Sequence, residues 1–87
     1  MNLNQLRYFV SVAESGSFTK AAQSHFVSQT AITQQIHALE ENIGTKLLDR
    51  NSRPVSLTPA GRVLLKEARE ILSRMDAARL RTREAST

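Results

Sequence analysis

Amide and hydroxyl side chains recur along residues 29–37, and they form the clearest chemical pattern in the sequence. Side chains of these types can pair with the donors and acceptors on base edges in the major groove of DNA, which admits one α-helix. A helix reads those edges when its N-terminal half carries hydrogen-bonding groups and nothing bulky or acidic. The residues that meet this requirement are Gln29, Thr30, Thr33 and Gln34.

The start of the same segment suits a phosphate group. Ser28 can cap a helix that begins at Gln29, and the amides at a helix N-terminus carry a partial positive charge that attracts anions. His37 lies further along the polar face, where we expect it to touch the DNA backbone. Glu40 and Glu41 follow at the far end, where their repulsion of phosphate is smallest.

A polar face of this kind can also be the solvated side of an ordinary surface helix. Such helices usually carry Lys and Glu, which favour helix formation and solubility, whereas Thr weakens a helix slightly. Gln and Thr in their place therefore favour the base-reading interpretation.

Two arginines, Arg50 and Arg53, bracket the tip of a predicted hairpin. Arginine on a projecting loop can follow a phosphate or enter a narrow minor groove, as the wing of a winged helix does. The alternative is an exposed ion pair, such as Arg50 with Asp49 or Glu41, which contributes little to stability. Beside a helix that reads DNA, the wing interpretation is favoured.

Other chemistries find no support in the residue types. The chain lacks cysteine, which excludes disulfides, thiolate metal sites and cysteine nucleophiles. The spacing of its two histidines does not fit a metal site, and His25 is expected to be a half-buried packing residue. The three glycines are expected to end helices rather than to form a phosphate-binding loop. We therefore expect no enzyme activity, no metal and no cofactor.

Length and composition limit the chain to one small domain. Its 87 residues can form one modest core, and 40% hydrophobic with 23% charged residues is ordinary for a globular protein. The net charge of +4 suits an anionic partner such as nucleic acid. No run of about 18 apolar residues and no signal peptide is present, so we expect a cytoplasmic protein that does not enter membranes.

Local signals divide the chain into helices and one hairpin. Gly16 and Gly44 are expected to end helices, and Pro59 at a first helical position favours a helix start. The expected capping residues are Asn2, Ser17, Ser28 and Thr58. The predicted elements are helices over 3–15, 17–25 and 29–42, a two-stranded hairpin over 47–57, and a helix of about 25 residues from 59.

Two of these helices are joined by a short turn, which is the arrangement of a helix-turn-helix. Phe26 and Val27 are expected to close that turn as a tight apolar pair. The second helix has an apolar face opposite its polar face, formed by Ile32, Ile36, Leu39 and Ile43. The predicted fold class is mainly α: a winged helix-turn-helix of three helices and a two-stranded wing over 1–58, followed by a linker helix over 59–87.

The linker helix carries a seam of apolar residues at coiled-coil spacing. A helix of this length cannot be covered by so small a domain, so the seam predicts a partner helix, most simply from a second copy. The predicted dimerisation residues are Leu64, Leu65, Ala68, Ile71, Leu72 and Met75. Residues 79–87 lose the apolar period and are expected to fray.

The ordered combination of motifs resembles the N-terminal DNA-binding domain of LysR-type transcriptional regulators. The matching residues are Phe18-Thr19-Lys20-Ala21-Ala22, Val27-Ser28-Gln29, Ile32, Ile36, Leu39-Glu40-Glu41, Gly44, Lys46-Leu47-Leu48, Arg50 and Leu57-Thr58-Pro59-Ala60-Gly61. The resemblance covers about residues 3–75.

The resemblance implies a homodimeric bacterial regulator that binds double-stranded promoter DNA at interrupted palindromes. Residues 29–42 are then expected in the major groove and residues 50–54 at the minor groove or backbone. The resemblance also implies that the linker helix pairs antiparallel with the same helix of a second copy. The family's effector-binding domain is missing from these 87 residues, so a small-molecule effector is expected to act only through that domain.

Three positions depart from the family pattern. Thr30 stands where proline is common, Gln34 replaces a frequent arginine, and His25 occupies a place that is usually apolar. Glutamine pairs well with adenine, whereas arginine favours guanine. We therefore expect Gln29 and Gln34 to shift half-site preference toward A·T pairs.

A competing interpretation is a protein-interaction module. In that case the last helix dimerises and the polar face of residues 29–42 merely faces solvent, without DNA reading. Only a DNA-binding domain predicts tight, salt-dependent and sequence-selective retention on a duplex.

Overall fold

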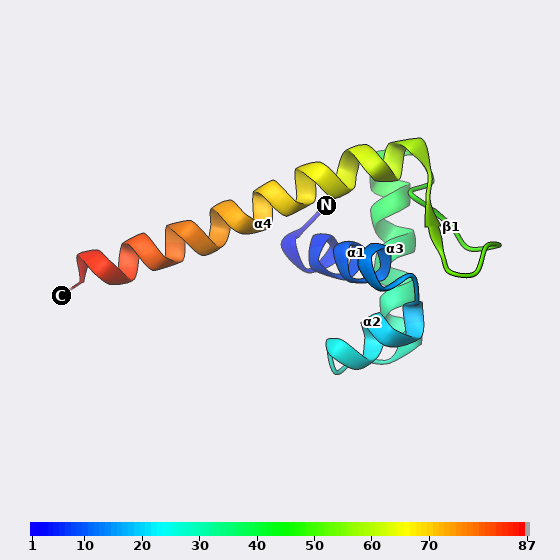
Figure 1. Cartoon of the computed structure of the whole chain (residues 1–87), viewed down its shortest axis with the longest axis horizontal. Coiled ribbons are helices and arrows are strands. Elements are labelled where there is room, and N and C mark those ends of the chain that lie inside the picture. Colours follow the sequence, from blue (N-terminus) through cyan, green and yellow to red (C-terminus); the bar gives the residue numbers. More distant parts are fainter. Residues whose placement is uncertain (87) are drawn as a thin grey trace.

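The computed structural model describes residues 1–86 and contains four helices with one two-stranded antiparallel sheet (Figure 1). The elements are α1 (Leu3–Ser15), α2 (Phe18–Ser24), α3 (Gln29–Ile43), β1 (Leu48–Asp49), β2 (Ser56–Leu57) and α4 (Pro59–Ala85). Helices α2 and α3 form the helix-turn-helix, and the two strands form the wing. The predicted fold class, a winged helix-turn-helix followed by a long helix, is confirmed.

Side-chain caps explain where the helices begin. Asn2 Oδ1 accepts a hydrogen bond from the Gln5 amide at 2.8 Å, and Gln5 Oε1 accepts one from the Asn2 amide at 3.2 Å, which completes a capping box. The side chains of Ser17, Ser28 and Thr58 each accept a hydrogen bond from an amide in the first turn of their helix. The four predicted caps are therefore confirmed.

Two of the three glycines end helices, and the third allows two segments of backbone to pack closely. Gly16 and Gly44 follow α1 and α3 in the left-handed conformation, with φ of 69° and 88°. Gly61 instead lies buried in the first turn of α4, where a Cβ atom would come within 2.0 Å of the Leu47 carbonyl oxygen. The expectation that every glycine ends a helix is wrong for Gly61, because α4 packs directly on the backbone that precedes β1.

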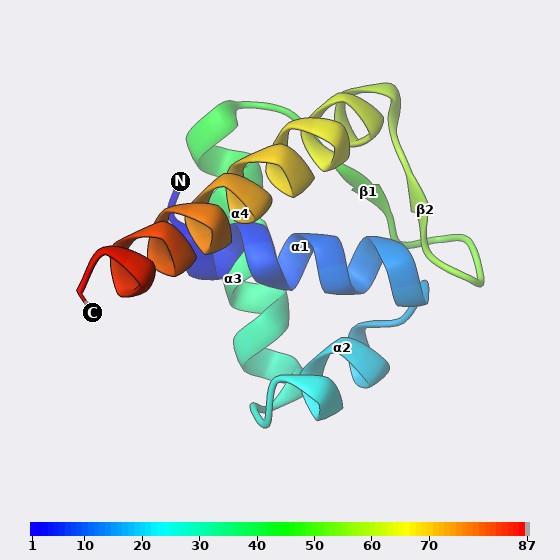
Figure 2. The same cartoon turned by 60° about the vertical axis from the view of Figure 1, so that its left-hand side comes forward.

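One hydrophobic core joins the first three helices to the wing. Helix α1 packs against α2, α3 and α4, which cross it in different directions (Figures 1 and 2). The small side chains of Ala21 and Ala22 are buried on α2, so α3 can approach closely. The buried core residues are Phe9, Val12, Ala21, Ala22, Ile32, Ile36, Leu39, Leu47, Leu48 and Val55.

Helix α4 extends away from the rest of the domain, and the molecule measures 50 × 26 × 20 Å (Figure 1). The expected fraying from residue 79 is wrong for the described residues, because α4 continues to Ala85 with the strong helix formers Ala, Arg and Leu. Residue 87 lies outside the described part of the chain. Among residues 1–86, no helix has both the length and the apolar content that a membrane crossing needs.

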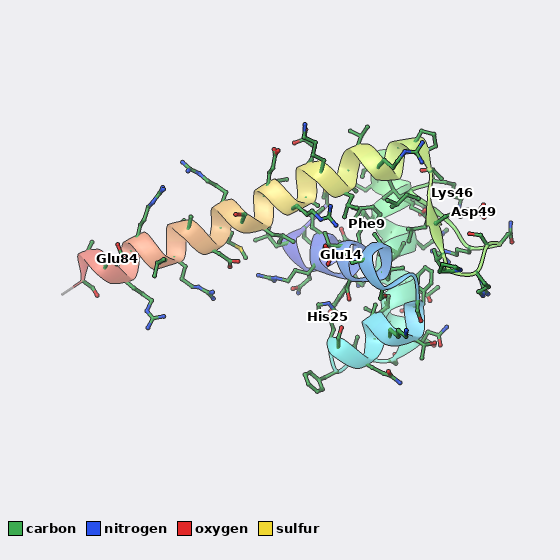
Figure 3. The ribbon with its side chains drawn as sticks, in the orientation of Figure 1. Phe9, Glu14, His25, Lys46, Asp49 and Glu84 are labelled. Atoms are coloured by element: carbon green, nitrogen blue, oxygen red, sulfur yellow. The ribbon has the colours of Figure 1, made fainter. Side chains whose placement is uncertain are left out.

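The chain itself covers the first part of the α4 seam. Ala68 is fully buried, and Leu64 and Leu65 pack against the core. Arg69 on α4 donates two hydrogen bonds, of 3.1 and 2.9 Å, to Oε2 of Glu14, which Figure 3 labels on α1. The other three predicted dimerisation residues keep exposed surface outside this cluster, and they are Ile71, Leu72 and Met75.

Two apolar residues lie outside the core, against expectation. Ile43 is 42% exposed because the last turn of α3 extends past the core, and the last buried side chains of this helix are those of Leu39 and Glu40. Phe26 is 94% exposed in a turn where its φ is 57°, while its neighbour Val27 packs against the core. The predicted apolar turn is therefore wrong for Phe26.

Candidate nucleic-acid interface

Helix α3 has two chemically distinct faces. Ile32 and Ile36 are completely buried on its inner face. The outer face carries the predicted base-reading set: Gln29, Thr30, Gln34 and His37 are exposed, and Thr33 is half-buried. The fold thus brings these amides and hydroxyls together on one accessible surface.

The N-terminus of α3 opens onto the same surface. Ser28 is exposed, and its Oγ accepts a hydrogen bond from the Ala31 amide at 3.0 Å. The first turn contains no acidic residue, so no carboxylate there neutralises the partial positive charge of the helix start. This end of α3 is therefore chemically suited to a phosphate group.

Helix α2 holds the first residue of α3. The Thr19 hydroxyl donates a hydrogen bond of 3.1 Å to Gln29 Oε1. Both side chains are exposed, so the contact lies on the surface that carries the predicted base-reading residues. Sequence spacing did not single out Thr19, because ten residues and a turn separate it from Gln29.

The wing is a short hairpin that is fixed at its base and along its loop. Strands β1 and β2 pair antiparallel, with Leu48 opposite Leu57. Ser52 Oγ donates to the Pro54 carbonyl at 3.1 Å, and the Val55 amide donates to the Gly16 carbonyl at 2.9 Å. The predicted hairpin over 47–57 is therefore confirmed, and the end of α1 holds its returning strand.

Arg53 is the exposed arginine of the wing loop. Its Nη1 donates to the carbonyl oxygens of Arg50 and Ser52, the latter at 3.0 Å. These bonds hold the cationic group close to its own loop, on the outer part of the wing. Arg53 therefore lies on the hairpin loop, as expected, but its guanidinium folds back onto that loop.

Arg50 does not project from the hairpin tip, in contrast to the expectation from sequence. Its guanidinium carbon lies 4.9 Å from the centre of the Phe18 ring, and its Nη2 lies 3.7 Å from Glu40 Oε1. The expected alternative, an exposed ion pair with Asp49 or Glu41, is also wrong, because the carboxylate that faces Arg50 is buried.

That buried carboxylate, on Glu40, is the residue whose role the sequence pattern missed. The pattern predicts a remote acidic group at the end of α3, but the Glu40 side chain is only 3% exposed. It accepts hydrogen bonds from the amides of Leu47 and Leu48, at 2.7 and 3.3 Å. Glu40 therefore joins α3 to the start of the wing, with its Oε1 3.9 Å from Lys46 Nζ. Figure 3 labels Lys46 and, on the following strand, Asp49.

A hollow of about 310 Å³ separates the wing from the helix-turn-helix. It brings both wing arginines to the same concave surface as two of the predicted reading residues. Its lining residues are Gly16, Ser17, Phe18, Thr19, Gln29, Thr33, Arg50, Arg53 and Val55. The surface is therefore continuous from α3 to the wing, with arginine on the wing side.

The two histidines have separate environments. His37 Nε2 lies 2.9 Å from Glu41 Oε1 one turn further along α3, and both side chains are exposed. His25, labelled in Figure 3, is half-buried. Its ring packs edge-on against the Tyr8 ring with the two ring centroids 5.0 Å apart, which agrees with its expected packing role. Within residues 1–86, no cluster of three histidine, cysteine or acidic side chains could hold a metal ion.

A two-helix motif with an exposed polar face and an arginine-bearing wing defines the class of winged helix-turn-helix proteins. The model of a family described as bacterial regulatory helix-turn-helix protein, lysR family, matches residues 3–62. The chain belongs to this LysR family of transcriptional regulators, as its motifs indicated.

Similar curated proteins are named as transcriptional regulators. The HTH-type transcriptional regulator TfdT of Cupriavidus pinatubonensis is 46% identical over 86 residues, which are 99% of this chain and 38% of TfdT. The HTH-type transcriptional regulator BenM of Acinetobacter baylyi is 47% identical over 76 residues, which are 87% of this chain and 25% of BenM. The chain therefore spans well under half the length of these relatives.

Solved structures of the same family have the same fold. The complex of the BenM DNA-binding domain with catB site 1 DNA superimposes with a TM-score of 0.98 at 42% identity, covering 100% of this chain and 97% of that one. The complex of the CbnR DNA-binding domain with DNA gives a TM-score of 0.93 at 42% identity, covering 100% of both chains.

Proposed function

We propose that this chain is the sequence-specific DNA-binding part of a homodimeric bacterial transcriptional regulator. Residues 29–42 enter the major groove, and wing residues 50–54 lie at the minor groove or the backbone. The observation that carries the proposal is the two-faced α3, whose inner isoleucines are fully buried while its outer amides and hydroxyls are accessible. A helix with this surface can pair with base edges that differ for each base pair.

The solved complexes support the placement of α3. BenM and CbnR domains at 42% identity share this fold, and both were crystallised with DNA. A common backbone with a polar outer face on α3 favours a common docking mode.

Each side chain of the surface has a distinct role in this proposal. The amides near Ser28 bind a phosphate group at the start of α3. The wing contact comes from Arg53, and His37 lies beside the backbone. The side chains that read bases are Gln29, Thr30, Thr33 and Gln34.

Dimerisation takes place along α4. Two copies of the chain pair antiparallel through the part of the seam that their own domains leave open, which includes Ile71, Leu72 and Met75. Such a dimer presents two copies of α3 related by a twofold axis, so it fits an interrupted palindrome. This role needs no catalysis and belongs in the bacterial cytoplasm, and a small-molecule effector acts through a further domain of the regulator.

Selection from random duplexes tests the proposal, followed by fluorescence anisotropy on the recovered duplex and on a scrambled one. We expect recovery of an interrupted palindrome and preferential binding to it. The logarithm of affinity should fall linearly with the logarithm of salt concentration, with a slope of about −0.9 for each phosphate contact. Equal retention of both duplexes, or binding that ignores salt, would contradict DNA reading and favour a protein-interaction module.

A further inference from the structure

The buried carboxylate of Glu40 links the base-reading helix to the wing. Its Oε2 accepts hydrogen bonds from the amides of Leu47 and Leu48, the residues that lead into and begin β1. The carbonyl of Glu40 also accepts from the amides of Gly44 and Thr45, at 2.8 and 3.1 Å. Glu40 therefore connects the end of α3 to the start of β1 through both its side chain and its backbone carbonyl.

The other carboxylate oxygen of Glu40 lacks a hydrogen bond. Within residues 1–86, Oε1 is buried and has no hydrogen-bond partner, and the nearest cations are Arg50 Nη2 at 3.7 Å and Lys46 Nζ at 3.9 Å. A buried anion needs a compensating charge. The Lys46 side chain is 72% exposed and Arg50 only 38%, so the attraction of Arg50 is the less screened of the two.

The guanidinium of Arg50 is held by three elements. It belongs to the residue that follows β1, it lies over the ring of Phe18 at the start of α2, and it faces Glu40 on α3. Its Nη2 is buried without a hydrogen-bond partner among the described residues. If the guanidinium turned outward to a phosphate, Glu40 would keep only the solvated Lys46 as its counterion.

We infer that Arg50 is a positioning residue that fixes the angle between the wing and α3 by neutralising Glu40, and that it is not a phosphate-binding residue. The inference deepens the proposed function and rests on it, since it concerns how the two DNA-contacting parts are aligned. The Arg50 carbonyl also accepts a hydrogen bond from Arg53, so the backbone that Arg50 anchors carries the exposed arginine.

Charge removal with rescue tests this role. Arg50→Gln removes the cation, Glu40→Gln removes the anion and keeps a carbonyl oxygen for the Leu47 amide, and the double variant removes both. Lys46→Gln is the matched control for the second cation near Glu40. Each variant is titrated by anisotropy against the selected duplex at several salt concentrations, and its unfolding temperature is measured without DNA.

For Arg50→Gln we expect affinity to fall about tenfold at every salt concentration, which is a typical coupling within one contact network, with the salt slope unchanged. Adding Glu40→Gln should restore most of that loss, because the carboxylate no longer needs a counterion. Lys46→Gln should change affinity less than Arg50→Gln does. A salt slope that is smaller by about 0.9 in Arg50→Gln, without rescue in the double variant, would show a phosphate contact and overturn the inference.

The unfolding measurement separates this inference from the proposed function. We expect Arg50→Gln to lower the unfolding temperature by about 4–8 °C, the shift typical of a small domain for one broken contact, and Glu40→Gln to reverse that change. If the wild-type chain bound no duplex, the proposed function would fail, yet the Glu40–Arg50 coupling would still appear in the unfolding temperatures. Independent, additive effects of the two substitutions would overturn the inference.

Discussion

The hydroxyl of Thr19 on α2 donates a hydrogen bond to Oε1 of Gln29, the first residue of α3, at 3.1 Å. The bond connects the two helices of the helix-turn-helix on their exposed side. Because Thr19 engages the side-chain oxygen of Gln29, the amide nitrogen of Gln29 is left to donate to a base acceptor in the proposed DNA complex. One exposed hydroxyl therefore restricts how this proposed base-reading side chain can point.

Replacing Thr19 by valine should loosen base selection by Gln29. One lost hydrogen bond corresponds to an affinity loss of about 2- to 10-fold, and the selected motif should weaken at one base pair of each half-site. Thr19→Ser keeps the hydroxyl and serves as the control. Site selection followed by anisotropy checks both effects, and an unchanged motif for Thr19→Val would argue against this orienting contact.

Arginine at position 34 should change the preferred base. Glutamine pairs with adenine and arginine with guanine, so Gln34→Arg should move one position of each half-site from A·T to G·C, with a discrimination of about 1–3 kcal/mol. The control is Gln23→Arg, which adds the same charge at an exposed site on α2. Selection from random DNA measures the preferred motif of each variant. Identical motifs for Gln34→Arg and the wild type would contradict base reading by residue 34.

Loss of Arg53 should weaken DNA binding uniformly across sequences. A single lost phosphate contact reduces the salt slope by about 0.9 and leaves the major-groove preference unchanged. Arg81→Ala lowers the net charge equally at an exposed site on α4, away from the wing, and should leave the slope close to that of the wild type. Salt titrations of both variants are the measurement, and equal slopes for Arg53→Ala and the wild type would exclude the wing contact.

Alanine at position 61 should destabilise the fold, although glycine to alanine within a helix ordinarily stabilises by about 0.5–1 kcal/mol. The new Cβ atom would lie 2.0 Å from the Leu47 carbonyl oxygen, so the start of α4 would have to move. We expect a loss of at least about 2 kcal/mol in the free energy of unfolding.

Gly44→Ala is the comparison for this substitution. Position 44 has open space around it and a φ of +88°, so backbone strain alone should cost about 1–2 kcal/mol. Urea denaturation gives the free energies of unfolding of the two variants, and we expect both to keep the wild-type dependence of that free energy on urea concentration. A Gly61→Ala protein as stable as the wild type would mean that α4 does not need this close approach.

Local signals in the sequence were sufficient for most of the fold. The cap at Asn2, the left-handed Gly16 and the hydroxyl of Thr58 act within a few residues of their position, so their effects can be predicted without tertiary information. Much of the outer face of α3 was predictable for the same reason, because helical periodicity separates Ile32 and Ile36 from Thr30 and Gln34. Gln29 lies two turns before Ile36 on the same side, and it is exposed because α3 begins there.

Contacts between distant segments could not be predicted in this way. Whether Glu40 is solvated or buried depends on where β1 passes, and the orientation of Arg50 depends on the Phe18 ring from another helix. Phe26 and Ile43 are apolar residues that the pattern assigns to the interior, yet the fold leaves Phe26 94% exposed and Ile43 42% exposed. Periodicity assigns a face to a residue, but only the packed fold decides whether that face is covered.

Two hydrogen bonds fix the start of helix α4 to the segment before β1. The Thr58 hydroxyl donates to the Lys46 carbonyl at 2.7 Å, and the Thr58 amide donates to the Leu47 carbonyl at 3.0 Å. An unbroken helix of 27 residues spans about 40 Å, and every residue added to it rotates the remainder of the helix by about 100°. Inserting a single alanine into its projecting part would thus rotate one copy of the chain relative to the other in the proposed dimer. On that proposal, the register of α4 sets the distance between the two copies of α3 and with it the length of the spacer between half-sites.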